Sequence, residues 1–507
     1  MCKRLTAFFL LVSLLFCTVV AQGDEPKELT NTDGYVYIVN DDNTAEIVGY
    51  TGKGKDLEIP SAIDGHTVTA IGLRAFAWNK ITTVKIPGTV NTLKTQCFDG
   101  CRNLKSVEMS EGVRTIQNDS FYRCEKLQTI NVPDSVTGFG EGVLGECWSL
   151  KEIQISENHS LLALVDGVLF TRDMTTLLWR PSTLKEKEYH VPEGVRIVGS
   201  SAITSKTLEK IVFPDSVEEI GWGNMSKKLK EVNIPPLVKE IDLSSMGPLE
   251  TVFVDEGNPV FESKDGVVFD KEKHMLVYYP QGRKAKEYVV PEGTEIIGRD
   301  AFASNNSLMK VELPSSVRII DGLAFQFVKK LNSIILPEGL EKIDGIAFQG
   351  CENLTEINIP NSLTTIADNP FYLCSKLKTI NVPEDHSRFA IMDEALVDKQ
   401  GMHLICFPSM SKQKTYRVPD GIKIIDKCAF GYCSSLQEII IPEGVEKLDE
   451  MAFVGCSKIK RFVLPASLKE IDKNALLDST NATFVVVRGS YAENFCQAYG
   501  LKIEYAE

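Results

Sequence analysis

The amino-acid sequence predicts a mainly β solenoid, in which short repeat units stack on one another along almost all of the chain. Three observations predict it. An apolar residue followed by proline recurs every 23 residues within two runs, 314–383 and 419–465, a segment of alternating apolar and polar residues precedes each proline, and a small residue followed by phenylalanine comes later. Such a fixed period is typical of repeat architectures, whose units bury their apolar faces only against neighbouring copies. The proline pairs are Leu313-Pro314, Leu336-Pro337, Ile359-Pro360, Val382-Pro383, Val418-Pro419, Ile441-Pro442 and Leu464-Pro465.

Residues 354–376 show the elements of one unit in order. Leu354, Ile357 and Ile359 can face a core. Glu356 and Asn358 lie between them and can face water, so the segment has the period-two pattern of a strand. Stacking successive units about 4.8 Å apart pairs each strand with the next and makes the core continuous. The proline that follows ends the strand because it has no N–H and its φ is fixed.

The small residue and phenylalanine that recur later in the unit form a second apolar position. The small residue permits a close approach of the neighbouring unit, and the ring fills the interior of the coil. We therefore expect these rings to lie in the core. The pairs are Ala75-Phe76, Ala301-Phe302, Ala324-Phe325, Ala347-Phe348, Ala429-Phe430 and Ala452-Phe453.

Three units are longer than the rest, and all three are lengthened in the same way. Each spans 36 residues, over 156–192, 255–291 and 383–419, and each has an acid-led apolar segment ten residues in. We interpret each as a β-hairpin with its turn at Arg172-Asp173, Lys271-Glu272 or Lys399-Gln400. Isolated Asp-Gly pairs such as Asp265-Gly266 are interpreted as turns. Counting the proline positions and their equivalents gives 17 units.

Units such as residues 354–376, with Leu363-x-x-Ile366 after Pro360 and with Cys374 near the end, resemble the 23-residue leucine-rich repeat of the BspA-like family of surface and secreted proteins. The resemblance covers roughly residues 35–507 and implies a leucine-rich-repeat solenoid over 56–480. It also implies an N-terminal cap over 22–55 and a strand–helix–strand C-terminal cap over 481–507. Caps are physically required, because end units otherwise expose apolar faces and unpaired strand edges.

Residues 1–21 are predicted to be a cleaved signal peptide. Lys3 and Arg4 precede an apolar run over 7–20, and Val19-Val20-Ala21 offers a cleavage site. The run is shorter than the ~20 residues that a membrane span needs, and no second apolar stretch follows. The mature chain is therefore expected to be secreted or displayed at the cell surface, with no membrane span. A retained anchor and lipid attachment at Cys17 are the alternatives.

Cysteine is the residue type that most invites a chemical interpretation, with 13 in the chain, of which Cys2 and Cys17 leave with the signal peptide. Most of the others occupy one position of the repeat, three residues after the aromatic or aliphatic residue of the core. In other units this position holds Asn79, Asn305 or Val328, which indicates a buried turn position. We expect buried free thiols there; disulfides between adjacent units and, less favoured, a zinc site are the alternatives. Seven cysteines occupy this position: Cys101, Cys124, Cys147, Cys351, Cys374, Cys433 and Cys456.

The histidines give no sign of catalysis. They are scattered over the predicted caps and enlarged units, each is expected at the surface, and no Ser/His/Asp or Cys/His arrangement can be recognised. Phosphate-binding and dinucleotide-binding motifs are missing from the sequence too. We therefore expect no catalytic residue, no cofactor and no metal, and a protein that is not an enzyme. The six are His66, His159, His190, His274, His386 and His403.

Binding is the function that such a surface suits, because outward strand positions can vary without disturbing the core. The net charge of −14 argues against nucleic acid and anionic membrane as partners. The resemblance implies an adhesin-like protein whose ligands are extracellular proteins or glycoproteins, such as host matrix components or other cells. Carbohydrate binding or scaffolding by the enlarged units, through aromatics such as Trp179, Tyr278, Tyr279 and Phe407, is the alternative. The candidate contact residues are Lys310, Glu312, Ile335, Glu356, Asn358, Thr379, Asn381, Glu438, Ile440, Arg461, Trp179 and Tyr279.

Overall fold

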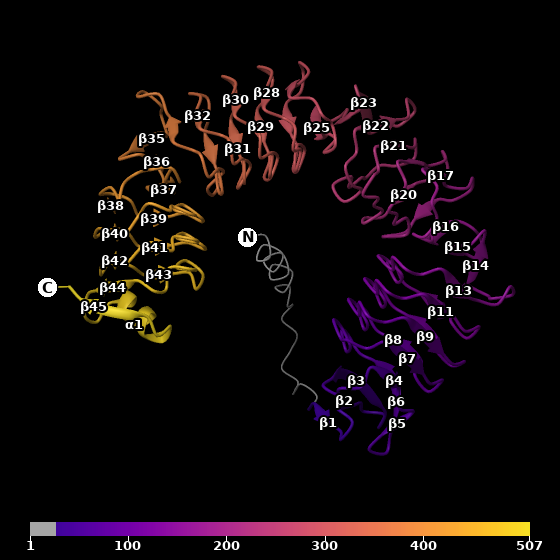
Figure 1. The fold of residues 1–507 in the computed structure, drawn as a ribbon. Coiled ribbons are helices and arrows are strands. Elements are labelled where there is room, and N and C mark those ends of the chain that lie inside the picture. The colour runs from indigo at the N-terminus through magenta and orange to yellow at the C-terminus, as the bar shows by residue number, and fades with distance from the viewer. Residues whose placement is uncertain (1–26, 507) are drawn as a thin grey trace. The chain divides into compact units, whose positions relative to one another are not determined.

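A computed structural model describes residues 27–506, which fold into two compact units, one ending at Leu161 and the other beginning at Leu162. In both units the strands of successive repeats follow one another in chain order (Figure 1). An ordinary repeat contributes a long strand of three or four residues and a short strand of two, and the two kinds form separate parallel sheets. The predicted mainly β solenoid is confirmed, and each predicted proline position or its equivalent follows one of the long strands.

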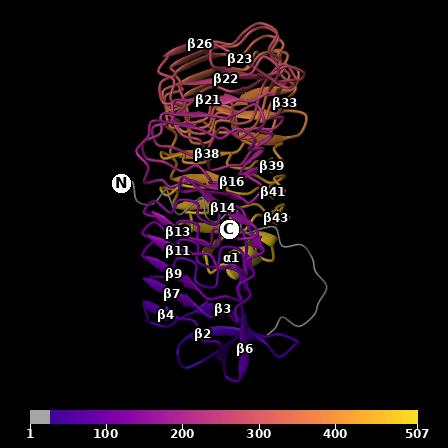
Figure 2. The same ribbon diagram turned by 90° about the vertical axis from the view of Figure 1, so that its right-hand side faces the viewer.

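Unit 1 opens with antiparallel strands and continues as two parallel sheets. The opening strands are β1 (Leu29–Thr30), β2 (Tyr35–Val39) and β3 (Ala45–Tyr50). A further strand, β5 (Ala62–Ile63), forms an antiparallel hairpin with β6 (His66–Ile71). The short-strand sheet runs through β6, β8 (Thr92–Leu93), β10 (Thr115–Ile116) and β12 (Gly138–Phe139). The long-strand sheet, seen in order along unit 1 in Figure 2, is β4 (Asp56–Glu58), β7 (Thr83–Ile86), β9 (Ser106–Met109), β11 (Thr129–Asn131) and β13 (Glu152–Gln154).

Unit 2 repeats the two parallel sheets but interrupts them at the enlarged repeats. Its long strands are β17 (Glu188–His190), β19 (Lys210–Val212), β21 (Glu231–Ile234), β22 (Thr251–Val254), β26 (Glu287–Val289), β28 (Lys310–Glu312), β30 (Ser333–Ile335), β32 (Glu356–Asn358), β34 (Thr379–Asn381), β38 (Thr415–Arg417), β40 (Glu438–Ile440) and β42 (Arg461–Val463). Its short strands are β18 (Ile197–Val198), β20 (Glu219–Ile220), β27 (Ile296–Ile297), β29 (Ile319–Ile320), β31 (Lys342–Ile343), β33 (Thr365–Ile366), β39 (Ile424–Ile425), β41 (Lys447–Leu448) and β43 (Glu470–Ile471).

Each enlarged repeat is a three-stranded antiparallel meander, which has one hairpin more than the sequence predicted. The predicted turns at 172–173, 271–272 and 399–400 are confirmed as the second hairpin of each meander. The first hairpin turns at an acidic residue whose φ is positive, as is that of its successor, the geometry of a two-residue hairpin turn. The third strand of each meander then pairs in parallel with the next short strand. The meanders are β14 (Leu162–Val165), β15 (Val168–Thr171) and β16 (Thr176–Trp179); β23 (Phe261–Lys264), β24 (Val267–Asp270) and β25 (Met275–Tyr278); β35 (Phe389–Met392), β36 (Ala395–Asp398) and β37 (His403–Cys406).

The chain ends in the strand–helix–strand sequence β44 (Thr483–Val486), α1 (Tyr491–Ala498) and β45 (Lys502–Tyr505). The Ser490 hydroxyl caps α1 by accepting the N–H of Glu493 at 3.2 Å. β45 pairs in parallel with β44 and forms the outer strand of its sheet. Among residues 27–506, no helix has the length and apolar character that crossing a bilayer requires. The predicted signal peptide, residues 1–21, lies outside the described residues.

The phenylalanines of the repeat lie in the core, as predicted, and the structure shows that they stack there in columns. The Phe325 ring lies 4.8 Å from that of Phe302 and 5.0 Å from that of Phe348, and both pairs are nearly parallel. Phe98 is stacked in the same way in unit 1, between Phe76 and Phe121. The ring spacing matches the spacing of paired strands, so each repeat adds one ring to a continuous column.

The cysteine position is buried, and all eleven cysteines of the described chain are free thiols. At the repeated position each thiol points to the backbone carbonyl of the phenylalanine, or its equivalent, in the preceding repeat, with Sγ···O distances of 2.9 to 3.8 Å. Burial raises the pKa of Cys101 and of Cys147 to about 12. The cysteines therefore belong to the core, where a small side chain with a weak donor links adjacent repeats.

Native protein at neutral pH is expected to react very slowly with a thiol reagent, because the buried thiols are neither accessible nor ionised. Unfolding in denaturant without reductant is expected to release all eleven thiols of residues 97–496. Absorbance titration with a chromogenic disulfide reagent measures both states. A count well below eleven that rises only after reductant is added is the result that contradicts buried free thiols.

Candidate functional site

The ten predicted contact residues on the strands lie on the long-strand sheets of unit 2, where three pairs of neighbouring strands bring them together. Lys310, Glu312 and Ile335 lie on β28 and β30. The residues from Glu356 to Asn381 lie on β32 and β34, and those from Glu438 to Arg461 on β40 and β42. Every one of these side chains is at least partly exposed, because it occupies an outward position of a strand whose central residue is buried.

Most of the polar candidates bond to one another. The Asn381 amide donates to Glu356 Oε1 at 2.5 Å and to Asn358 Oδ1 at 2.8 Å. Lys310 pairs with Glu312 on its own strand. Such pairs between exposed strand residues stabilise the sheet by only a few tenths of a kcal/mol to about 1 kcal/mol. These side chains therefore solvate and hold the sheet surface even with no ligand bound.

Arg461 is the most heavily paired of the candidates. Its guanidinium lies 3.2 Å from the Glu438 carboxylate on β40 and 2.9 Å from the Glu504 carboxylate on β45. Two carboxylates on opposite sides hold the side chain between them. A ligand that contacts Arg461 therefore has to compete with both carboxylates for the guanidinium group.

The apolar candidates differ sharply in exposure. Ile335 is 65% exposed, whereas Ile440 is exposed only in part. The structure adds two residues at the same outward strand position that the sequence analysis did not select, Val289 at 64% and Phe253 at 51% exposure. Both lie two residues before the proline position or its equivalent, as Ile335 does. The period-two alternation of the strand therefore already indicated that these side chains face outward. Val289 and Ile335 are the opposite neighbours of Glu312 in the sheet, and we call them the apolar pair.

Trp179 and Tyr279 are not surface aromatics, so their selection as contact residues is wrong. Trp179 is 2% and Tyr279 0% exposed, and Tyr278 and Phe407 are buried as well. The reason is that the third strand of each meander ends in the core, and in the second and third meanders an aromatic ring there joins the phenylalanine column. The Tyr279 ring lies 5.1 Å from that of Phe302 and so begins the column that Phe325 and Phe348 continue. Carbohydrate binding through these aromatics loses its basis.

Two of the six histidines are buried, which corrects the expectation that all lie at the surface. His159 and His386 occupy the same position of the first and third enlarged repeats. In each, Nε2 meets the carbonyl of the proline of the preceding repeat, Pro133 at 3.1 Å and Pro360 at 3.2 Å. Asn258 donates to the Pro235 carbonyl at 2.8 Å in the second enlarged repeat. These side chains anchor the start of each meander to the preceding turn.

Nδ1 of His386 accepts the backbone N–H groups of Arg388 and Phe389, both at 3.1 Å. A histidine that accepts at one nitrogen and meets a carbonyl at the other is neutral. Burial lowers the pKa of His386, in agreement with this arrangement. The histidine therefore serves the fold and offers no free base.

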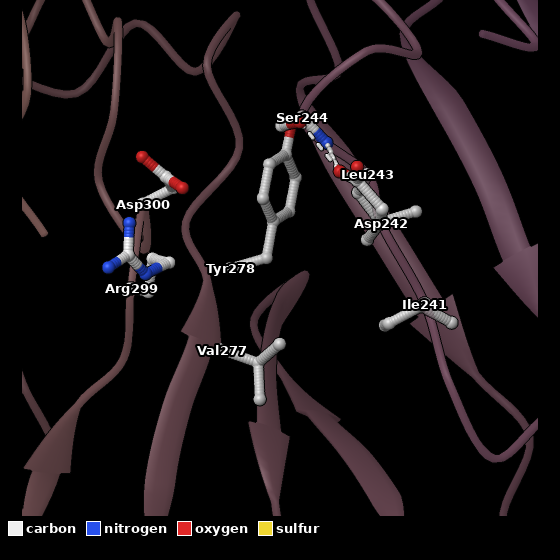
Figure 3. Close-up of a pocket in the computed structure, with 8 residues that line it drawn as sticks. All are labelled: Ile241, Asp242, Leu243, Ser244, Val277, Tyr278, Arg299 and Asp300. Carbon is white, nitrogen blue, oxygen red and sulfur yellow. Dashed lines mark hydrogen bonds between the residues drawn. The ribbon is translucent and has the colours of Figure 1, made fainter. Parts of the chain in front are cut away.

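A recess of about 280 Å³ lies beside the second meander, where residues 240–243 form no strand in the described chain. Figure 3 shows the Tyr278 ring between Asp300 on one side and the 241–244 segment on the other. Ser244 binds back to Asp242, which accepts its N–H at 2.9 Å and its hydroxyl at 2.6 Å. The lining residues are Ile241, Asp242, Leu243, Ser244, Val277, Tyr278, Arg299 and Asp300.

The recess is lined by polar as well as apolar groups. Burial raises the pKa of Asp300, and Tyr278 Oη makes no hydrogen bond of ordinary geometry within the described chain. Neither histidine nor cysteine lines it, and the Ser244 hydroxyl donates to the Asp242 carboxylate of its own segment. Over residues 27–506, no three His, Cys, Asp or Glu side chains gather in a group that could hold a metal ion.

Comparison with known families identifies the repeat. Residues 69–164, 182–250, 278–394 and 403–496 match the family described as the BspA type leucine rich repeat region, with six copies. Together these segments cover well over half of the chain. No curated protein matches the chain.

Several solved structures are similar to the chain at low identity and low TM-score. A leucine rich cell surface protein from Faecalibacterium prausnitzii A2-165 is 22% identical, with a TM-score of 0.33 over 96% of this chain and 100% of that chain. The pneumococcal vaccine antigen PcpA is 18% identical, with a TM-score of 0.33 over 95% and 99%. A leucine-rich repeat protein from Bacteroides ovatus is 21% identical, with a TM-score of 0.29 over 94% and 99%. Likenesses at these values say nothing about ligands.

Proposed function

This chain belongs to the BspA-type leucine-rich repeat family, and on that premise we propose that it is an exported, non-enzymatic binding protein whose ligands are extracellular proteins. The observation that carries the proposal is the apolar pair, two aliphatic side chains about two-thirds exposed on the long-strand face of unit 2. Elsewhere on that face the outward positions are mostly polar or charged. Secreted or cell-surface placement is part of the proposal, supported by the signal-like residues 1–21.

The apolar pair has the composition of a small protein-contact site. Protein interfaces concentrate their binding energy in a few apolar or aromatic anchors that a polar rim surrounds. Here Val289 and Ile335 are the anchors, and Lys310 and Glu312 on the strand between them are the rim. The hydrogen-bonded sheet holds all four at fixed spacing, so little conformational entropy is lost on binding.

The decisive experiment replaces both anchors in the full mature chain, as Val289→Ser with Ile335→Ser. Binding to immobilised collagen, laminin and fibronectin is measured by biolayer interferometry. We expect the parent chain to bind at least one of the three, and the double variant to bind it at least about tenfold more weakly, because the buried apolar contact is lost.

Leu164→Ser with Val165→Ser is the matched control. These residues are also neighbouring exposed aliphatic side chains of unit 2, but they lie on the meander strand β14. The control is expected to bind like the parent, within about twofold, since the change is outside the proposed contact. Absence of binding to all three proteins, or an equal loss in the two double variants, overturns the proposal.

A further inference from the structure

Five lysines of unit 1 lie on five consecutive repeats along one edge of the long-strand sheet. Three of them stand immediately before a long strand, and two stand three residues before one. All five side chains are exposed. We call them the lysine row: Lys55, Lys80, Lys105, Lys126 and Lys151.

Backbone hydrogen bonds hold this edge in register. The N–H of Thr82 donates to the Lys55 carbonyl at 2.6 Å, and that of Lys105 to the Thr82 carbonyl at 2.7 Å. The next repeats continue the chain, with Gln128 donating to Lys105 at 2.8 Å and Lys151 to Gln128 at 3.1 Å. At about 4.8 Å per repeat, the four steps from Lys55 to Lys151 place the row along about 19 Å of the sheet edge.

The row carries positive charge that no carboxylate of the described chain pairs with. None of the five ammonium groups lies within 4.0 Å of a described carboxylate, and Lys126 Nζ meets the neutral Asn103 Oδ1 at 2.9 Å. The Asp56 carboxylate beside Lys55 accepts the hydroxyls of Thr82 and Thr83 at 2.6 and 2.8 Å, and these hydrogen bonds, with the charges of Lys105 and Lys55, lower its pKa. A recess of about 290 Å³ is lined by four of the lysines together with Thr82 and Asn103, and by no acid.

The equivalent edge of the long-strand sheet at the start of unit 2 shows that the fold does not require an excess of positive charge. There the position before the long strand alternates in charge, as Lys187, Glu209, Lys230 and Glu250, and the same backbone hydrogen bonds link it. Glu209 lies 3.2 Å from Lys187 and 2.8 Å from Lys230. Unit 1 has Thr82 and Gln128 where unit 2 has glutamates, so the positive charge of its edge stays available.

We propose that the lysine row binds a linear sulfated polysaccharide that runs along the edge of the long-strand sheet of unit 1. The five cations, one on each of five successive repeats, fit a chain of repeating sulfate groups, and Thr82, Asn103 and Gln128 between them can hydrogen-bond sugar hydroxyls. Single-stranded nucleic acid fits less well, because no aromatic side chain lines the recess for a base to stack on. The site is separate from the apolar pair, so either can fail without the other.

The test measures binding of the full mature chain to a heparin octasaccharide and to the same octasaccharide after chemical desulfation, at near-physiological salt. We expect only the sulfated form to bind, and binding to weaken steeply as salt is raised, because association releases counterions. The triple change Lys80→Gln, Lys105→Gln and Lys126→Gln is expected to weaken binding at least about tenfold and to flatten the salt dependence.

The matched control is Lys286→Gln, Lys378→Gln and Lys460→Gln. These exposed lysines stand immediately before β26, β34 and β42, so the net charge changes equally, but the three sites lie on repeats that are not adjacent. The control is expected to bind within about twofold of the parent. Three results overturn the proposal: no binding by the parent, equal weakening in both triple variants, or a single-stranded oligonucleotide that binds as tightly and depends on the same three lysines.

Discussion

Replacing Phe325 with alanine is expected to lower the free energy of unfolding of unit 2 by about 3–5 kcal/mol. Phe325 is fully buried, and its ring is stacked between those of Phe302 and Phe348. The substitution removes both ring contacts and leaves a cavity at the centre of the column, which rigid sheets on the sides of the coil cannot close. Because each repeat is stabilised mainly by its neighbours, the damage extends to the repeats on both sides.

Urea unfolding of the full chain, followed by far-ultraviolet circular dichroism, measures this effect. Phe253→Ala is the matched control, since Phe253 is the same residue type in unit 2 but half exposed on an outward strand position. We expect the control to cost less than about 1 kcal/mol. If the two variants unfold at the same urea concentration, the phenylalanine column does not provide the stability assigned to it.

Replacing Asn305 with alanine is the second change with a large expected effect, a loss of about 3 kcal/mol or more of unfolding free energy. Asn305 occupies the position that cysteine holds in seven other repeats and is fully buried. Its amide donates to the carbonyls of Pro280, Gln281 and Arg283, at 3.0, 3.2 and 3.2 Å. Its Oδ1 accepts two further backbone N–H groups, at 2.8 and 2.9 Å. Alanine removes all five of these hydrogen bonds, and of the three carbonyls Pro280 keeps the N–H of Arg283 at 3.2 Å.

Asn306→Ala tests whether the effect belongs to the buried position. Asn306 is the neighbouring asparagine, but it is exposed and makes one hydrogen bond, to the Ser304 carbonyl at 2.9 Å. We expect its substitution to change stability by less than about 0.5 kcal/mol. Thermal and urea unfolding of the two variants decide the matter, and a small effect at both positions argues that the turn after the second meander relaxes to satisfy its own backbone.

Much of the fold could be predicted because the same local sequence pattern recurs in every ordinary repeat. The alternation around Ile357 and Ile359, the proline that ends the strand and the position of Phe348 each follow from one unit and then apply to its neighbours. Residue choice at the cysteine position, with Asn305 and Val328 among its occupants, revealed burial in the same way. Errors appeared where this pattern changes, in the enlarged repeats.

The enlarged repeats show why the rest could not be predicted. Trp179 and Tyr279 lie in segments that the ordinary repeat lacks, so the repeat pattern does not predict that both are buried or that the Tyr279 ring joins the phenylalanine column. The same holds for His159 and His386, whose partners are carbonyls of the preceding repeat, more than twenty residues away. Whether a side chain of an enlarged repeat is buried depends on where the meander rejoins the parallel strands of the ordinary repeats.

By itself the sequence determined the period, the strand and turn positions and the identity of the core, because each is a local property that every copy repeats. Only the tertiary structure decided which outward side chains remain available to a ligand. Val289 and Ile335 stand exposed while Arg461 is held by two carboxylates, and the lysine row is positive although the whole chain carries a net charge of −14. The physical reason is that exposure and charge pairing are set by neighbours in the stack, about 4.8 Å away in space and 20 or more residues away in the chain.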